Sequence, residues 1–301
     1  MSIFDRLVLT KIETTNGTDS LPVPATDAIR VSTANITPNV EAIDRAVLKT
    51  TMGNLPHMIG KKTATVELEV ELKGSGAAGT APEMAPLLKA CGLVETVTAG
   101  TDVSYTPSTT ATETATIYIY KDGLLWKLLG SKGKVSFETT IGQITLMKFT
   151  MQALYTPPVL SAVPSGAAYQ SSQPIIANNV DVATESLGAI KVATVGFDDG
   201  NDLQEHYVIG EHSFQIAQRQ PTATITKDSV GTTAEWDGLA AGLDAAISLT
   251  FGVAGNQFKA DFPVARKEGI GYSERAERDT LDASYRLYES VGDDQYTFTF
   301  A

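Results

Sequence analysis

The sequence predicts a mainly β protein, built as two tandem, related domains that each carry a short helix. Three observations support this fold class. Strand patterns dominate the chain, helix signals are few, and a proline-rich segment near the middle separates halves that share short motifs. The chain has 301 residues, which exceeds the size at which a single hydrophobic core usually stops growing.

The clearest strand signal is residues 63–72, which read TATVELEVEL. Its four aliphatic residues fall on one face of a strand, and Glu67, Glu69 and Glu71 fall on the other. Strict alternation of this kind is typical of a half-buried strand in an antiparallel sheet.

Further strands are expected on both sides of this one. Residues 116–129 predict a hairpin, because two apolar runs flank the turn-forming pair Asp122-Gly123. Residues 134–155 hold two more strand-like runs around residues 141–143, and residues 296–300 hold another.

Two short helices are expected. Residues 82–92 predict the first, with Pro82 at its start, Glu83 near the positive end of the helix dipole and Gly92 at its stop. Residues 234–246 predict the second, which two internal glycines weaken.

Residues 156–178 contain four prolines among Ser, Gly and Ala, which indicates a linker. We therefore expect domains at 1–158 and 180–301, joined by a linker at 159–179. Four short motifs recur in the same order on both sides, which favours a duplication over two unrelated β-domains. The pairs are 28–33 with 189–194, 63–66 with 222–225, 83–84 with 235–236, and 154–155 with 287–288.

The charge of the chain disfavours nucleic-acid binding through phosphates. Its net charge is −12, and residues 161–301 carry 20 acidic and 9 basic side chains against 15 and 14 in residues 1–160. Phosphate binding needs clustered Lys and Arg. The single cysteine excludes an intrachain disulfide. Without a signal-peptide pattern or an apolar run of bilayer length, we expect a soluble protein made in the cytoplasm, with no membrane partner.

Residues 74–79 form a G-x-G-x-x-G pattern between a strand and a helix, with Glu95 downstream. A Rossmann first strand is buried on both faces, whereas this one alternates with glutamates. Residues 80–82 also delay the helix, so we interpret the pattern as a flexible loop.

The remaining motifs do not predict an active site. His206 and His212 stand six residues apart, which is not the helical spacing of a zinc site, and we expect surface histidines. Residues 198–202 resemble a calcium loop in composition but lack the distal glutamate, so a solvated turn is expected. Cys91 is expected to be a small buried hydrophobe. We therefore predict no enzyme activity, no metal and no cofactor.

An ordered set of motifs resembles the tail tube proteins of long-tailed bacteriophages, of the siphophage and prophage type. The similarity covers most of the chain and is strongest over residues 59–158. The motifs are residues 60–62, 66–76, 79–82, 87–92, 105–107, 128–130 and 154–158, with 200–201 and 219–221 in the second half.

The resemblance implies a structural virion protein of the tail, assembled in the host cytoplasm. It also implies the architecture of the mainly β chain: two tandem tail-tube-like β-sandwich or barrel domains, each with a short flanking helix. Such subunits polymerise as stacked rings into a hollow tube that delivers the genome. The implied partners are the chain itself, the tape measure protein, the tail terminator and distal tail proteins, and double-stranded DNA in transit without sequence-specific binding. The alternatives are another self-assembling phage protein, such as a decoration or baseplate subunit, and a carbohydrate-binding β-module.

Three expectations about assembly follow. Two tube domains per chain would make a ring of three chains pseudo-hexameric. Residues 38–60 are too long for a tight hairpin and are expected to contact neighbouring subunits or rings. The contact residues expected in this segment are Arg45, Leu48, Met52, Leu55, Met58 and Ile59. Glu67, Glu69 and Glu71 are expected to face the lumen, where carboxylates would repel DNA, although an ordinary outer face is the alternative.

Overall fold

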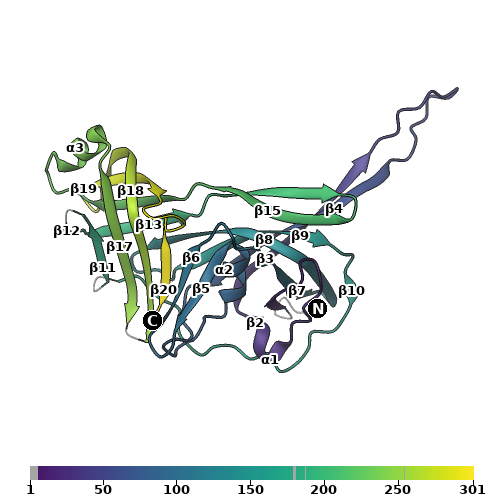
Figure 1. The fold of residues 1–301 in the computed structure, drawn as a ribbon, viewed down its shortest axis with the longest axis horizontal. Coiled ribbons are helices and arrows are strands. Elements are labelled where there is room, and N and C mark those ends of the chain that lie inside the picture. The colour runs from purple at the N-terminus through teal and green to yellow at the C-terminus, as the bar shows by residue number, and fades with distance from the viewer. Residues whose placement is uncertain (1–5, 179–180, 187, 254) are drawn as a thin grey trace.

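The computed structural model of the chain describes residues 6–178, 181–186, 188–253 and 255–301, and it confirms the mainly β prediction (Figure 1). The elements of the first half are β1 Leu7–Ile12, α1 Pro24–Asp27, β2 Ala28–Ile29, β3 Val31–Ile43, β4 Met58–Glu71, α2 Ala85–Ala90, β5 Leu93–Thr98, β6 Asp102–Pro107, β7 Ala115–Lys121, β8 Leu124–Thr140, β9 Leu146–Tyr155 and β10 Val159–Leu160. The elements of the second half are β11 Val182–Glu185, β12 Gly188–Ala189, β13 Val192–Asp198, β14 Asn201–Val208, β15 Glu211–Arg219, β16 Thr222–Asp228, α3 Ala234–Ala241, β17 Asp244–Val253, β18 Asn256–Arg275, β19 Arg278–Tyr288 and β20 Thr297–Phe300.

An antiparallel sheet of eight strands, here called the main sheet, runs through both halves. Its order is β3-β4-β9-β8-β13-β16-β19-β18, and every neighbouring pair is antiparallel. The first four strands come from the first half of the chain and the last four from the second. The halves meet where β8 pairs with β13, with Phe137 opposite Phe197.

The two halves share one pairing scheme. The order β3-β4-β9-β8 in the first half corresponds to β13-β16-β19-β18 in the second. Outside the main sheet, β1 pairs with β2 and β7, and β11 pairs with β12 and β17. The four sequence motifs that recur in the two halves fall on corresponding elements of this scheme: β2–β3 and β12–β13, β4 and β16, the residues just before α2 and the first turn of α3, and the ends of β9 and β19.

The halves differ by two hairpins. β5 and β6 form an addition to the first half, between α2 and β7. β14 and β15 form a separate two-stranded sheet in the second half, between β13 and β16. The last strand, β20, pairs with β18 on one side and with β6 on the other, so it links the second half back to the first.

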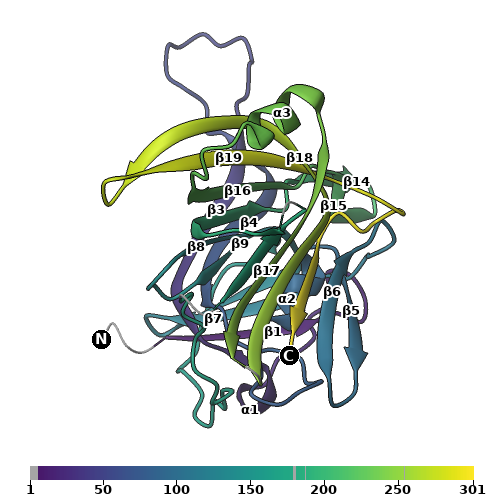
Figure 2. The ribbon, with the colours of Figure 1, turned by 90° about the vertical axis from the view of Figure 1, so that its left-hand side faces the viewer.

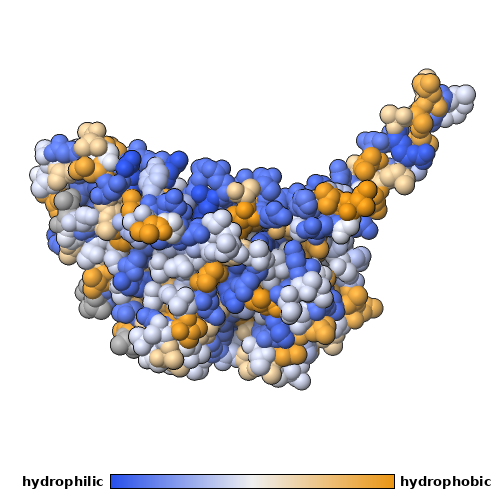
Figure 3. Space-filling view, in the orientation of Figure 1, coloured by the Kyte–Doolittle hydropathy of each residue, from blue (hydrophilic) through white to orange (hydrophobic). Residues whose placement is uncertain are grey.

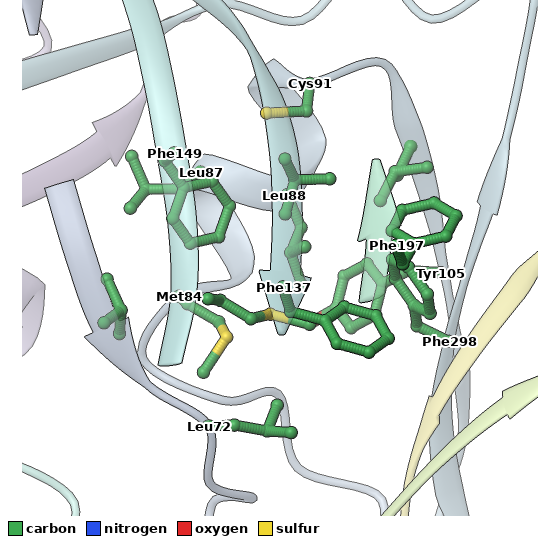
Figure 4. Packing of buried hydrophobic residues seen from close by; sticks show 14 of the residues in the cluster. Leu72, Met84, Leu87, Leu88, Cys91, Tyr105, Phe137, Phe149, Phe197 and Phe298 are labelled. Carbon is green, nitrogen blue, oxygen red and sulfur yellow. The ribbon is translucent and has the colours of Figure 1, made fainter. Parts of the chain in front are cut away.

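One hydrophobic core serves both halves (Figure 4). Leu87 and Leu88 of α2 are fully buried in it, as is Phe149 of β9. Aromatic rings meet at the junction of the halves, where the centroids of Phe137 and Phe197 lie 5.4 Å apart. Burial of such large apolar side chains is the dominant stabilising term in folding.

The segment predicted as a linker packs against the first half. Its start forms β10, which pairs with β8. Further on, Ile175 and Ala177 are buried in the common core, and the Ile175 amide donates a hydrogen bond to the Leu72 carbonyl. Proline and small residues therefore mark a segment without long strands, but one that lies tightly along the domain surface.

The predicted helices are both present and both shorter than expected. α2 covers six residues, and Gly92 follows it with φ +83°, which favours glycine. α3 ends at Gly242, whose left-handed conformation stops the helix, so the expectation of helix through residue 246 is wrong there. The predicted hairpin turn is confirmed, with positive φ at both Asp122 and Gly123.

Candidate assembly surfaces

The main sheet has one apolar face and one polar face. Val66, Leu68 and Val70 are buried against the core, as the alternation predicts. The polar face is the opposite one. It carries Glu67, Glu69 and Glu71 of β4, Thr150 and Lys148 of β9, Lys134, Ser136 and Glu138 of β8, Asp198 of β13, and Thr222, Thr224 and Thr226 of β16.

The three predicted glutamates differ in exposure within this face. Glu67 is exposed, whereas Glu69 and Glu71 are half-buried. Glu69 lies opposite Lys148 and accepts a 3.0 Å hydrogen bond from the Thr33 hydroxyl. The face is therefore a mixed one, in which lysines and threonines stand beside the acidic residues.

The main sheet ends in two strand edges that carry no partner within the described chain. β3 pairs with β4 alone, and residues 267–275 of β18 pair with β19 alone. An open edge presents unpaired N–H and C=O groups, which makes it a site for pairing with another chain. Because six strands lie between them and every neighbouring pair is antiparallel, the two edge strands run in opposite directions.

Residues 38–60, here called the projecting arm, extend the β3–β4 hairpin away from the body of the molecule (Figure 1). The strands reach further into this segment than expected, since Ile43 still pairs with Met58, and the connecting loop is residues 44–57. Figure 3 shows apolar residues along the arm. Of the six predicted contact residues, Leu55 is half-buried. The other five are exposed, and for four of them the relative accessibility is given in parentheses: Arg45, Leu48 (106%), Met52 (105%), Met58 (58%) and Ile59 (59%).

The β14–β15 hairpin, here called the seated hairpin, takes the same place in the second half as the projecting arm in the first. It lies across the first half (Figure 1). About midway along the hairpin, Glu205 forms a 2.6 Å ion pair with Lys61 of β4 and lies 2.9 Å from the His212 ring nitrogen. The two predicted surface histidines are therefore part of this hairpin, and His212 is half-buried there.

The base of the seated hairpin is fixed to the end of α2. The Asn201 side-chain amide donates to the carbonyls of Cys91 (2.8 Å) and Gly133 (3.2 Å). Arg219 donates to the Asn201 side-chain oxygen and to the Gly92 carbonyl. A Cβ at Gly92 would lie 2.8 Å from both Arg219 and Ile216, so the hairpin closes directly over this glycine.

Asp199, expected in a solvated turn, is instead fully buried beneath this base, which corrects that expectation. Burial raises the pKa of Asp199 to about 7, against the opposing effect of hydrogen bonds from the backbone amides of Val135 and Asn201. The turn itself needs glycine at Gly200, because φ is +60° and a Cβ would lie 2.0 Å from the Gln220 carbonyl oxygen.

A buried ionic cluster joins α3 to the main sheet. Lys227 of β16 contacts Glu185 of β11 and, at 2.7 Å, Glu235 of α3, and Lys267 of β18 contacts both carboxylates at 2.8 Å. Burial would raise the pKa of Glu185, but hydrogen bonds from the two lysines hold it below its usual value. The first half has a simpler counterpart, the buried pair of Lys73 and Glu83 at 3.3 Å.

The other motifs occupy structural positions. The loop at residues 74–79 is tied down by a hydrogen bond from the Gly74 amide to the Asn256 side chain. Glu95 accepts a 2.6 Å hydrogen bond from the Tyr105 hydroxyl. Cys91 is fully buried, as predicted, and burial raises the pKa of its thiol.

Within the ranges that the structure describes, no three His, Cys, Asp or Glu side chains come together as a possible metal site. In the same ranges no helix has the length and apolarity needed to cross a membrane.

Comparison with known families gives one match. The sequence model of a family described as phage tail tube protein matches residues 4–286, which is nearly the whole chain. No curated protein matches the chain.

Proposed function

The chain belongs to the phage tail tube protein family, and we propose that it polymerises as stacked rings into the tube of a phage tail, the conduit for genome delivery. The family is structural, and we propose no catalytic role and no cofactor for this member. Its place is the virion tail, with assembly in the host cytoplasm.

The observation that carries this proposal is the main sheet with its two open edges. β3 and the end of β18 run antiparallel to each other, so β18 of one copy can pair with β3 of the next. An interface between different surfaces of identical subunits closes into a ring when the rotation between them permits. The main sheets of successive copies would then form one continuous barrel around a channel.

We further propose that the ring contains three chains and that each chain is a duplication, with domains at 1–158 and 180–301 and a linker at 159–179. The support is the shared pairing scheme, β3-β4-β9-β8 and β13-β16-β19-β18. Two equivalent four-stranded units per chain make a ring of three chains pseudo-sixfold. The β8–β13 pairing inside the chain would be repeated by the β18–β3 pairing between chains.

The polar face of the main sheet is the proposed wall of the channel. Its apolar opposite face packs on the core, so only the polar face can meet solvent inside a barrel. Glu67, Glu69 and Glu71 would repel DNA phosphates and let double-stranded DNA slide without sequence-specific binding. The tape measure protein would fill the channel before DNA, and tail terminator and distal tail proteins would bind the tube ends.

Electron microscopy of the purified protein tests the proposal. We expect tubes or rings whose end views show three subunits and six similar lobes. End views with six complete chains would contradict the trimeric ring but keep the tube. Closed particles without a channel would contradict the tube itself and favour a decoration or baseplate role.

A further inference from the structure

The two halves each extend a hairpin from the same point of the shared pairing scheme. The projecting arm connects β3 to β4, and the seated hairpin connects the corresponding strands β13 and β16. The seated hairpin starts at the end of β13, crosses the β8–β13 junction and packs on the first half of the chain. The projecting arm extends from the open edge strand β3, and the corresponding surface is at the other end of the same main sheet (Figure 1).

The surface that receives the seated hairpin has a counterpart in the second half. Gly92 ends α2 with φ +83°, and Gly242 ends α3 with φ +63°. A Cβ at Gly92 would collide with the seated hairpin, whereas a Cβ at Gly242 would meet no described atom within 4 Å. Leu243, which follows, is 61% exposed. The end of α3 is thus uncovered where the end of α2 is covered.

The strand beside each helix end also has a counterpart in the other half, since β8 corresponds to β18. Val135 of β8 lies opposite Phe149 of β9, and Tyr272 of β18 lies opposite Leu281 of β19. Phe149 and Leu281 stand at the same position relative to the matched strands β4 and β16, so their partners Val135 and Tyr272 occupy corresponding positions in the two halves. Val135 is fully buried beside the seated hairpin, but Tyr272 is 65% exposed. Figure 2 shows α3 lying against β18, where the rings of Trp236 and Tyr272 are 5.3 Å apart.

We propose that the projecting arm of one copy docks on the end of α3 and on β18 of the neighbouring copy in the ring, as the seated hairpin docks on the end of α2 and on β8 within the chain. The occupant is a second copy of this chain, and the docking rests on the proposed ring assembly. The arm has no route to this surface in its own chain, because β3 and β18 are opposite edges of the main sheet.

Chain spacing indicates which arm residues make the contact. Ile216 and Arg219, which cover Gly92, precede Thr222 of β16. At the same spacing before Thr63 of β4, the projecting arm has residues 57–60, which include the exposed Met58 and Ile59. The dock therefore brings apolar arm residues onto the exposed Leu243 and Tyr272. Burial of apolar side chains on both partners favours such a contact.

Photo-crosslinking on assembled particles tests the proposal. The full chain carries benzoylphenylalanine in place of Met58, and mass spectrometry identifies the linked peptides. We expect links between different copies, to residues 238–246 or to the β18 segment around Tyr272. A matched probe at Leu160, which is 90% exposed, should not link to these residues. Links from position 58 to any other surface of a normally formed ring would overturn the dock and leave the ring intact. Absence of rings would instead contradict the proposed function, and the dock with it.

A variant gives an independent measurement. Leu243→Asp should leave the monomer folded, because the side chain is exposed, but should raise the protein concentration needed for half-maximal assembly about tenfold. The matched control Leu160→Asp should assemble as the unmodified chain does. Equal assembly of both variants and the unmodified chain would overturn the dock.

Discussion

The side-chain amide of Asn201 lies 2.8 Å from the carbonyl oxygen of Cys91, 110 positions earlier in the chain. This hydrogen bond satisfies a carbonyl at the end of α2, where the helix itself offers no donor. It also joins the first residue of the seated hairpin to the opposite half. The attachment of the hairpin thus depends on one buried amide that bonds several elements at once.

Replacement of this amide should destabilise the folded monomer. Asn201→Leu removes the side-chain donor of the Cys91 and Gly133 carbonyls and the acceptor of the Arg219 Nε–H, and each buried group left unsatisfied costs about 1–3 kcal/mol. Urea unfolding should show a loss of at least about 2 kcal/mol. The control Asn54→Leu lies in the exposed loop of the arm and should change stability by less than about 0.5 kcal/mol. Equal midpoints for the two variants would contradict this role.

Asp199 should make stability depend on pH. Burial raises its pKa to about 7, above the value of 3.8 for an unperturbed carboxyl, so the folded state holds a proton more tightly than the unfolded state. Its contribution is fully present below the unfolded pKa and is lost as pH rises toward 7, by up to about 1.4 kcal/mol per pH unit. Asp199→Asn cannot titrate. Urea unfolding at pH 5 and pH 7.5 should show the unmodified chain gaining more stability at pH 5 than the variant does. The same pH response in both would rule out Asp199 as the cause.

The ionic cluster around Lys227 should be sensitive to the loss of one charge. Lys227→Met leaves Glu185 and Glu235 with Lys267 as their remaining lysine, and removal of one partner from a buried ion pair costs about 3–5 kcal/mol. Thermal unfolding should show a large drop in the melting temperature. Lys259→Met removes a lysine that is 46% exposed in its side chain and should cost less than about 1 kcal/mol. Partial recovery of the melting temperature is expected in the double variant Lys227→Met, Glu235→Gln. A Lys227→Met variant as stable as the unmodified chain would refute the argument.

The local part of the fold was predictable and the long-range part was not. Alternation in residues 63–72 predicts both the strand β4 and its two faces, because side-chain direction follows from backbone geometry. The β8–β13 pairing joins residues about 60 positions apart, and no local pattern predicts it. Asn201 and Arg219 bond to carbonyls of distant elements, so their role is invisible in the sequence. Lys227 did leave a signal, since it continues the apolar alternation of Ala223 and Ile225 and must therefore be buried.

The projecting arm should be dispensable for folding and required for assembly. Ile43 and Met58 are cross-strand partners, so residues 44–57 can be replaced by an Asn-Gly turn that closes the shortened hairpin. We expect a soluble monomer with an unchanged circular dichroism spectrum and no tubes in electron micrographs. A matched variant that replaces 44–57 with fourteen Gly and Ser residues separates the loop's sequence from its length. Normal tubes from the short variant would refute the requirement.

The polar face of β4 offers the most direct test of the channel. Glu67, Glu69 and Glu71 share that face, and none of the three is fully buried, so lysine at these positions should leave the monomer stable and tubes able to form. Lysines that line a channel would bind DNA phosphates with counterion release, and the neighbouring Lys148 would add to the positive charge. Phage particles with the triple lysine variant should therefore eject DNA slowly, and added salt should restore the rate, because salt weakens phosphate binding. The triple glutamine variant removes the acidic charge without adding a basic one and should eject at nearly the normal rate. If the lysine particles eject normally at low salt, these residues face the outside of the tube, and the channel must be lined by another surface.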